Sequence, residues 1–206
     1  MRFNLLDLLK KVPIDFGQGS LRHRTEGKRI AFGFVGDGEG RRALDLGSGD
    51  GYWTDQLKTK GWQVASVDRE KCRQDTIIVN AEKPLALSDN YFDLVWCSEV
   101  IEHIANIRTI LSEIRRVVKP GGLIIITTPN SYFWLYKLLG IFGLTPKRLQ
   151  NLDHKHFFSY ADIRGMFPSA DILGYFPYAV LKLKIRKFAG LLSPTFVVIQ
   201  HNVKQQ

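Results

Sequence analysis

Residues 41–55, RRALDLGSGDGYWTD, decide the fold. The apolar run Ala43–Leu46 is followed by glycines at positions 47, 49 and 51, and a helix-compatible stretch begins near Tyr52. This order predicts a strand, a tight turn and a helix. The free N–H groups at the start of such a helix face the turn, which therefore suits a ligand with a carboxylate or a phosphate.

The spacing of the glycines argues against a dinucleotide. The third glycine comes one residue too early for the G-x-G-x-x-G fingerprint. Asp45 lies two residues before Gly47, where its carboxylate would repel a pyrophosphate and attract a ligand with a positive charge. A glycine turn in an unrelated α/β protein is the alternative interpretation.

The stretch D-L-G-S-G-D-G resembles motif I of the class I S-adenosylmethionine (SAM) methyltransferases. The cofactor of that family carries an ammonium, a carboxylate and a sulfonium. The resemblance implies that the cofactor is bound by five residues of this turn: Asp45, Gly47, Ser48, Gly49 and Gly51.

Asp68 is a candidate for binding ribose. It ends the second expected strand, Trp62–Val67, about twenty residues after the glycine turn, where a carboxylate can reach ribose hydroxyls. Its position also resembles the acidic residue of motif II. Asn80 and Ala81 follow the next apolar run, where many family members have Asp-Ala, and the resemblance implies that they contact adenine. Too few residues lie before that run for the usual helix, so we expect a tight crossover.

The bulky run Tyr91–Cys97 predicts a buried parallel strand. F-D-L-V followed by E-V-I-E-H-I resembles motif IV and its sequel in the small-molecule branch of the family, which includes the ubiquinone-biosynthesis O-methyltransferases. On this resemblance, Cys97 is expected to border the cofactor.

Glu99, Glu102 and His103 have the spacing i, i+3, i+4, so we expect them on one helical face. Three interpretations remain open, in order of preference. The residues have a structural role, His103 or Glu99 acts as a base near the acceptor, or the group binds a divalent metal. No metal is assigned, because the third interpretation ranks last and the two cysteines lack metal-ligand spacing.

The resemblance extends over Arg41–Asn130, because R-V-V-K-P-G-G-L-I-I-I-T-T-P-N follows a helical stripe in the family order. It implies a doubly wound, mostly parallel, seven-stranded α/β sheet with an antiparallel last strand, Rossmann-like, in a single domain of residues 1–206. Within it, residues 1–40 form a helical cover, 41–130 the cofactor half and 131–206 the substrate half. Asp171–Phe176 and Thr195–Asn202 read as the last strands, with a basic amphipathic segment, Lys182–Leu192, between them.

The substrate half begins with a region expected to act as a lid, residues 131–158. Its apolar run Tyr132–Leu144 is too short to span a bilayer, and a buried or lid helix is preferred over contact with lipid or a hydrophobic substrate. His154 and His156 join His103 as candidate catalytic bases, with ordering of the loop as the alternative role.

The net charge of the chain gives information about the kind of molecule that it binds. The net charge is +9, and residues 131–206 contain ten lysines and arginines but only three acids. This excess fits an anionic substrate, a membrane surface, nucleic acid or a solvated face. Two cysteines without a disulfide pattern, together with an N-terminus broken by charge, favour a cytoplasmic protein.

The function expected on the resemblance is a SAM-dependent methyltransferase acting on a small molecule. We expect O-methylation of a sugar, a quinone or a lipid-linked intermediate, and an amphipathic or anionic acceptor. A peripheral contact with a membrane is left open. No proline follows Cys97, which argues against the motif of adenine and glutamine N-methyltransferases. An RNA methyltransferase is the weaker alternative because no stacking motif is evident. A SAM-binding partner protein without catalysis is the other.

Overall fold

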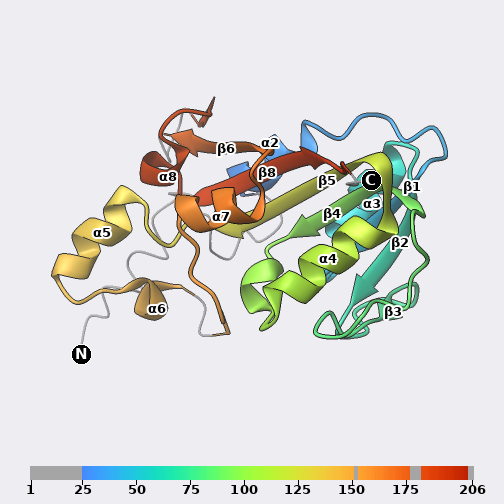
Figure 1. Cartoon of the computed structure of the whole chain (residues 1–206), viewed down its shortest axis with the longest axis horizontal. Coiled ribbons are helices and arrows are strands. Elements are labelled where there is room, and N and C mark those ends of the chain that lie inside the picture. Colours follow the sequence, from blue (N-terminus) through green and yellow to red (C-terminus); the bar gives the residue numbers. More distant parts are fainter. Residues whose placement is uncertain (1–24, 151–152, 177–181, 204–206) are drawn as a thin grey trace.

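A computed structural model describes residues 25–150, 153–176 and 182–203. An eight-stranded sheet runs through the molecule in the order β3-β2-β1-β4-β5-β8-β6-β7 (Figure 1). The strands are β1 (Arg42–Leu46), β2 (Gln63–Asp68), β3 (Ile77–Ile78), β4 (Phe92–Ser98), β5 (Val118–Pro129), β6 (Asp171–Phe176), β7 (Leu183–Ile185) and β8 (Thr195–His201).

The sheet is doubly wound. Strands β1 to β5 pair in parallel, whereas β8 is antiparallel to both β5 and β6. The chain order reverses between β1 and β4, and in such sheets ligands bind in the crevice outside the carboxyl ends of the strands at this point. The predicted architecture is therefore confirmed, with one correction: the segment expected to be amphipathic also supplies an eighth strand, β7, on the edge.

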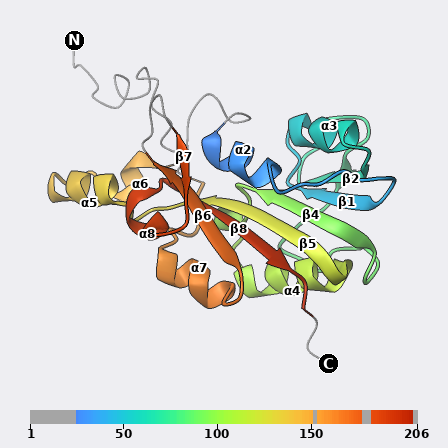
Figure 2. The same cartoon turned by 90° about the horizontal axis from the view of Figure 1, so that it is seen from above.

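Helices cover both faces of the sheet (Figure 2). One face carries α2 and α3, and the other carries α4 and α7, each burying its apolar stripe in one of two cores. The helices are α2 (Glu26–Phe32), α3 (Tyr52–Thr59), the 3-10 turn η1 (Ile101–His103), α4 (Ile107–Val117), α5 (Trp134–Ile141), α6 (Pro146–Leu149), α7 (Tyr160–Met166) and α8 (Ala189–Leu192).

The crossover between β2 and β3 contains no helix, as its length predicts. Arg73 holds this segment against α3 instead. Its guanidinium pairs with Asp55 at 2.8 Å and Asp75 at 3.1 Å, and it donates to the carbonyl of Gly51 at 3.3 Å. The wall of the crevice beside β2 is thus held by ion pairs in place of apolar packing.

Several expected boundaries differ from the structure. Of the helical cover expected in residues 1–40, the structure describes α2, and residues 1–24 lie outside the described residues. Strand β5 begins at Val118 and includes the Pro-Gly-Gly segment, with an irregular register opposite β4. None of the described helices combines the length and the apolar character needed to cross a membrane.

The apolar run after β5 forms α5, which is not a buried helix. Tyr136 is its one buried residue, while Trp134, Leu138 and Ile141 are exposed. The buried alternative is therefore wrong, whereas the preferred lid role stays a prediction.

Candidate active site

The glycine turn after β1 is pinned to β2. The N–H groups of Gly47 and Ser48 both donate to the carbonyl of Val67, at 2.9 and 3.0 Å. Gly47 has a φ of +77°, and a Cβ there would lie 2.2 Å from a methyl carbon of Val100. At Gly49 a Cβ would meet no atom of the described chain within 4 Å, so the turn is open on that side.

Gly51 begins α3 in the left-handed region, with a φ of +82°. The start of the helix therefore faces the turn, as the sequence predicts, and its N–H groups favour an anionic group there.

The Asp68 carboxylate lies against this turn. Its Oδ2 accepts the N–H of Gly49 at 2.8 Å, and its Oδ1 accepts the N–H of Glu70 at 3.2 Å. Each carboxylate oxygen has a second lone pair, so both remain able to accept hydroxyl groups. The position predicted for ribose binding is therefore chemically competent.

Asp45 is a buried carboxyl group at the end of β1. It is 1% exposed and accepts the hydroxyl of Thr54 at 2.6 Å. Burial is the main cause that raises the pKa of Asp45 to about 7, and the negative charge of Asp68 raises it further. The hydrogen bond from Thr54 and the positive charge of Lys28 both lower this pKa. The site therefore favours a positive charge beside Asp45.

Lys28 is a candidate site residue that the sequence interpretation missed. It lies on α2, is 8% exposed, and its charge lowers the pKa values of both Asp45 and Glu102. The sequence signal that could have identified Lys28 is its spacing of three residues from the apolar Ala31, which places both on the buried face of α2. A carboxylate and an ammonium at this end of the crevice complement a zwitterionic amino-acid group.

The remaining predicted cofactor residues line the crevice less directly. Asn80 is exposed beyond β3, and its side-chain oxygen accepts the N–H of Glu82 at 2.9 Å; Ala81 is half-buried. Cys97 is buried in β4 between Leu46 and Ile126 of the neighbouring strands. Burial raises the pKa of its thiol well above its usual range, so Cys97 packs as a neutral group.

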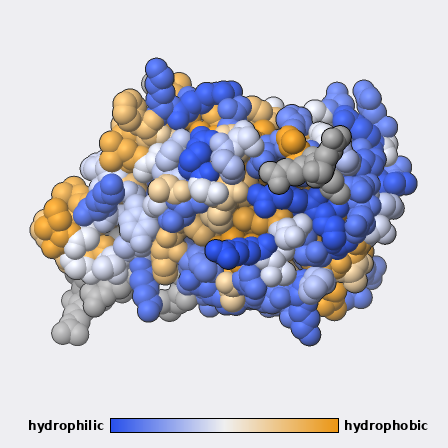
Figure 3. All heavy atoms as spheres, viewed as in Figure 1, coloured by the Kyte–Doolittle hydropathy of each residue, from blue (hydrophilic) through white to orange (hydrophobic). Residues whose placement is uncertain are grey.

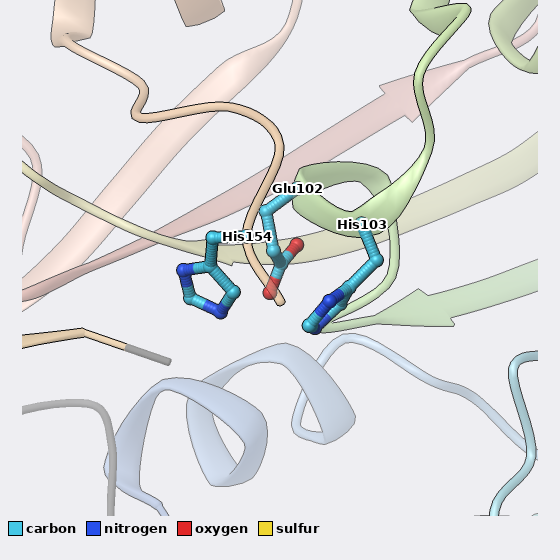
Figure 4. Close-up of side chains that lie close together, drawn as sticks. All are labelled: Glu102, His103 and His154. Carbon is cyan, nitrogen blue, oxygen red and sulfur yellow. The ribbon is translucent and has the colours of Figure 1, made fainter. Parts of the chain in front are cut away.

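Three side chains meet at the ends of β4 and β5. The Glu102 carboxylate lies between the rings of His103 and His154, and one ligand atom from each lies within 4.8 Å of the others (Figure 4). The two imidazole rings are 4.8 Å apart, edge to face. The chain reaches this arrangement because the N–H groups of Lys155 and His156 both donate to the main-chain carbonyl of Glu102, at 2.8 and 3.1 Å.

Glu102 is 1% exposed, and only one of its two carboxyl oxygens has a hydrogen-bond partner among the described residues. Its Oε2 accepts the hydroxyl of Thr128 at 3.0 Å, whereas its Oε1 and the Nδ1 of His154 are buried without a hydrogen-bond partner among the described residues. Buried polar atoms are normally paired. These two atoms therefore suit a ligand, a proton or a cation.

The electrostatics of the cluster disfavour charge. Burial and then the neighbouring Glu99 raise the pKa of Glu102 well above its usual range. Burial and then His103 lower the pKa of His154 to about 4, so this imidazole is neutral at pH 7. The neutral ring of His154 can accept a proton from an acceptor hydroxyl, whereas Glu102 can do so only in its ionised form. The same donor set suits a divalent cation such as Zn²⁺. The geometry thus supports the metal interpretation more than the spacing did.

One expectation about this cluster is wrong. Glu99 is not on a helical face with Glu102 and His103, because it precedes η1 and has a left-handed φ of +57°. Its carboxylate instead accepts the hydroxyl of Thr127 at 3.0 Å. The strand end, and not a helix, brings Glu99 close to Glu102.

His156 lies apart from the other two histidines. Its Nε2 lies 3.2 Å from the carbonyl of Ala105, and its ring stacks on Phe158 with centroids 5.8 Å apart. It lines a groove of about 690 Å³ beside α4 and α7. The structure therefore brings together His103 and His154 but not His156.

Comparison with known proteins is consistent with this geometry. A family model described as a methyltransferase domain matches residues 20–173. A ubiquinone biosynthesis O-methyltransferase from Photobacterium profundum is 25% identical over 62% of this chain and 61% of its own length. Another from Maricaulis maris is 35% identical over 48% of this chain and 45% of its own length. The chain thus spans about half to three fifths of these relatives.

A solved structure gives the same fold. The SAM-dependent methyltransferase from Archaeoglobus fulgidus superposes with a TM-score of 0.62 at 20% identity, over 85% of this chain and 92% of that one. The chain therefore belongs to the methyltransferase-domain family and has the Rossmann-like fold of its class I members, for which S-adenosyl-L-methionine is the cofactor.

Proposed function

We propose that this chain is a SAM-dependent methyltransferase that methylates a hydroxyl group of a small molecule such as a sugar, a quinone or a lipid-linked intermediate. The observation that carries the proposal is the cluster of the buried Glu102 with the half-buried His103 and His154, which follows Val100, the residue that packs against Gly47 of the glycine turn. An oxygen nucleophile must lose a proton as the methyl group arrives, and this cluster offers proton acceptors there. The relatives named above, which are O-methyltransferases by name, support this choice of acceptor atom.

Different residues of the site bind different parts of the cofactor. Asp45 and Lys28 suit the ammonium and carboxylate of its amino-acid end. The turn at Gly49 accommodates the chain of the ligand without a clash, and Asp68 accepts the ribose hydroxyls. When bound, SAM supplies a methyl group already activated by the sulfonium.

The protein then has to orient the acceptor, exclude water and receive a proton. Orientation alone can lower such a barrier by about 7–11 kcal/mol, and a general base contributes about 10²–10⁴-fold. The neutral imidazole of His154 is the group placed to receive the proton, and Thr128 donates to the Glu102 carboxyl group beside it.

The test is methyl transfer from radiolabelled SAM to a panel of catechols, hydroquinones, sugars and amines, with products identified by mass spectrometry. We expect O-methylated products from one hydroxyl class. Methylation of amines alone, or of RNA alone, contradicts the proposal. Binding of S-adenosylhomocysteine (SAH) with no transfer to any acceptor would identify a non-catalytic binding protein.

A further inference from the structure

Helix α5 presents apolar side chains to solvent. Trp134, Leu138 and Ile141 follow one another at the spacing i, i+4, i+7, and Phe142 follows directly. Ile141 is 78% exposed and Phe142 is 75% exposed, while Tyr136 packs into the core on the opposite side. A surface helix normally turns polar residues to water, so this outer face indicates a partner.

Basic residues accompany these apolar ones. Lys137 is exposed and lies on the same helical face, one turn before Ile141, and Lys147 is exposed on α6. Residues 131–206 as a whole contain ten basic and three acidic residues. The partner of this face therefore carries negative charge next to apolar material.

A second element extends the same end of the molecule. Phe188 is 71% exposed just before α8, with Lys187 beside it, and it has a left-handed φ of +57° that is costly for a bulky residue. Asn130 ties α8 to the segment that leads into α5, because its side chain donates to the carbonyls of Gly190 and Ser193 at 2.9 and 2.8 Å. The ring of Phe188 is therefore exposed close to the segment that leads into α5.

The exposed apolar residues of α5 and α8 lie at one end of the molecule. Helices α5 and α8 lie at the same end of the molecule in both ribbon views, and apolar atoms gather at the α5 end in the space-filling view (Figures 1, 2 and 3). The apolar end surface consists of Trp134, Leu138, Ile141, Phe142, Phe188 and Leu191.

We propose that the apolar end surface docks on an anionic lipid bilayer. Apolar tips that enter the acyl boundary, flanked by lysines at the level of the headgroups, are the features of interfacial segments. Trp134 begins α5 five residues after β5 ends, and β5 carries the Thr128 hydroxyl that binds Glu102. Docking would bring the acceptor side of the site close to the lipid. This inference rests on the proposed function, and it narrows the acceptor to an amphipathic molecule held in the membrane.

The test is co-sedimentation of the full chain with vesicles of phosphatidylcholine alone and of phosphatidylcholine with phosphatidylglycerol. We expect binding to the anionic vesicles, weakened by salt. Ile141→Ser/Phe142→Ser should lower the partition coefficient about tenfold or more, because two exposed apolar side chains no longer enter the bilayer. Lys137→Ala should lower it roughly fivefold on anionic vesicles and leave binding to neutral vesicles unchanged.

The matched control is Ile77→Ser/Ile78→Ser on β3 at the far edge of the sheet, where the two side chains are 50% and 62% exposed. This variant should bind vesicles like the wild type. Equal loss in both double variants, or no sedimentation of the wild type, overturns the proposal. A wild-type dimer that Ile141→Ser/Phe142→Ser converts to a monomer, without vesicle binding, assigns the surface to a second copy of the chain and also overturns it.

The readout separates this inference from the proposed function. Vesicle binding requires no methyl transfer, and titration with SAH requires no lipid. Loss of vesicle binding with SAH binding intact removes the docking surface alone, whereas vesicle binding without SAH binding removes the proposed function alone.

Discussion

The main-chain N–H of Gly49 donates to the carboxylate of Asp68 over 2.8 Å, which ties the glycine turn after β1 to the end of β2. The same carboxylate is therefore a structural acceptor and the candidate ribose ligand. Its two roles can be separated by measuring ligand affinity and unfolding on the same variants.

Asp68→Ala should weaken SAH binding by about 1–3 kcal/mol, because hydrogen bonds from the ribose to a charged group are lost. Isothermal titration calorimetry measures this directly. Asp171→Ala, which removes an exposed carboxylate paired with Arg186, serves as the control and should leave the affinity unchanged. Equal affinity in the wild type and Asp68→Ala would contradict the ribose role.

Lys28→Met should weaken the binding of SAH about tenfold or more, because the carboxylate of the ligand loses a buried cationic partner. 5′-Methylthioadenosine lacks the amino-acid group, so its affinity should stay within about twofold of the wild-type value. Arg29→Met is the matched control, since Arg29 is exposed and pairs with Glu26. Parallel losses for both ligands would mean that Lys28 acts only through the fold.

Asp45 should make the stability of the ligand-free protein depend on pH. Its pKa is raised from 3.8 to about 7 in the folded protein, so between about pH 4 and pH 7 the folded state holds a proton that the unfolded chain has released. Stability contributed by this proton is lost as the pH rises through that window. The Tm of Asp45→Asn minus that of the wild type should therefore increase from pH 5 to pH 8, and a constant difference would refute the buried, proton-holding Asp45.

The cluster at η1 offers a divalent-cation site as the alternative to accepting a proton. Two ring nitrogens and a buried carboxylate oxygen within 4.8 Å of one another form a competent donor set. Titration calorimetry with Zn²⁺ should show one site in the wild type that Glu102→Gln and His154→Ala each remove. His156→Ala should keep the site, since that ring lies on the groove beside α4 and α7. Absence of heat in the wild type would leave proton acceptance as the role of the cluster.

The three histidines should separate in the methyl-transfer assay. His103→Ala and His154→Ala are expected to lower kcat by about 10²–10⁴-fold while the KM for SAM stays the same, because both rings belong to the Glu102 cluster and not to the glycine turn. His156→Ala should retain most of the rate. A rate loss in His156→Ala alone would place the acceptor in the groove beside α4 and α7 instead.

Features that depend only on residues close together in the chain could be predicted from the sequence. Periodic apolar runs and glycines identify β1, the turn and α3, and strand-end acids such as Asp68 follow from chain order. Long-range features could not be predicted in this way. His154 meets His103 only because the loop after α6 hydrogen-bonds to the carbonyl of Glu102. Likewise, Lys28 becomes a site residue only when α2 folds over the sheet.

Arg73 replaces a helix by ion pairs on the wall of the crevice beside β2. A wall of this kind responds to dissolved electrolyte, since added ions weaken the attraction of Arg73 to Asp55 and Asp75 while leaving apolar packing elsewhere intact. The rigidity of the segment beside the expected nucleoside position therefore depends on the salt concentration.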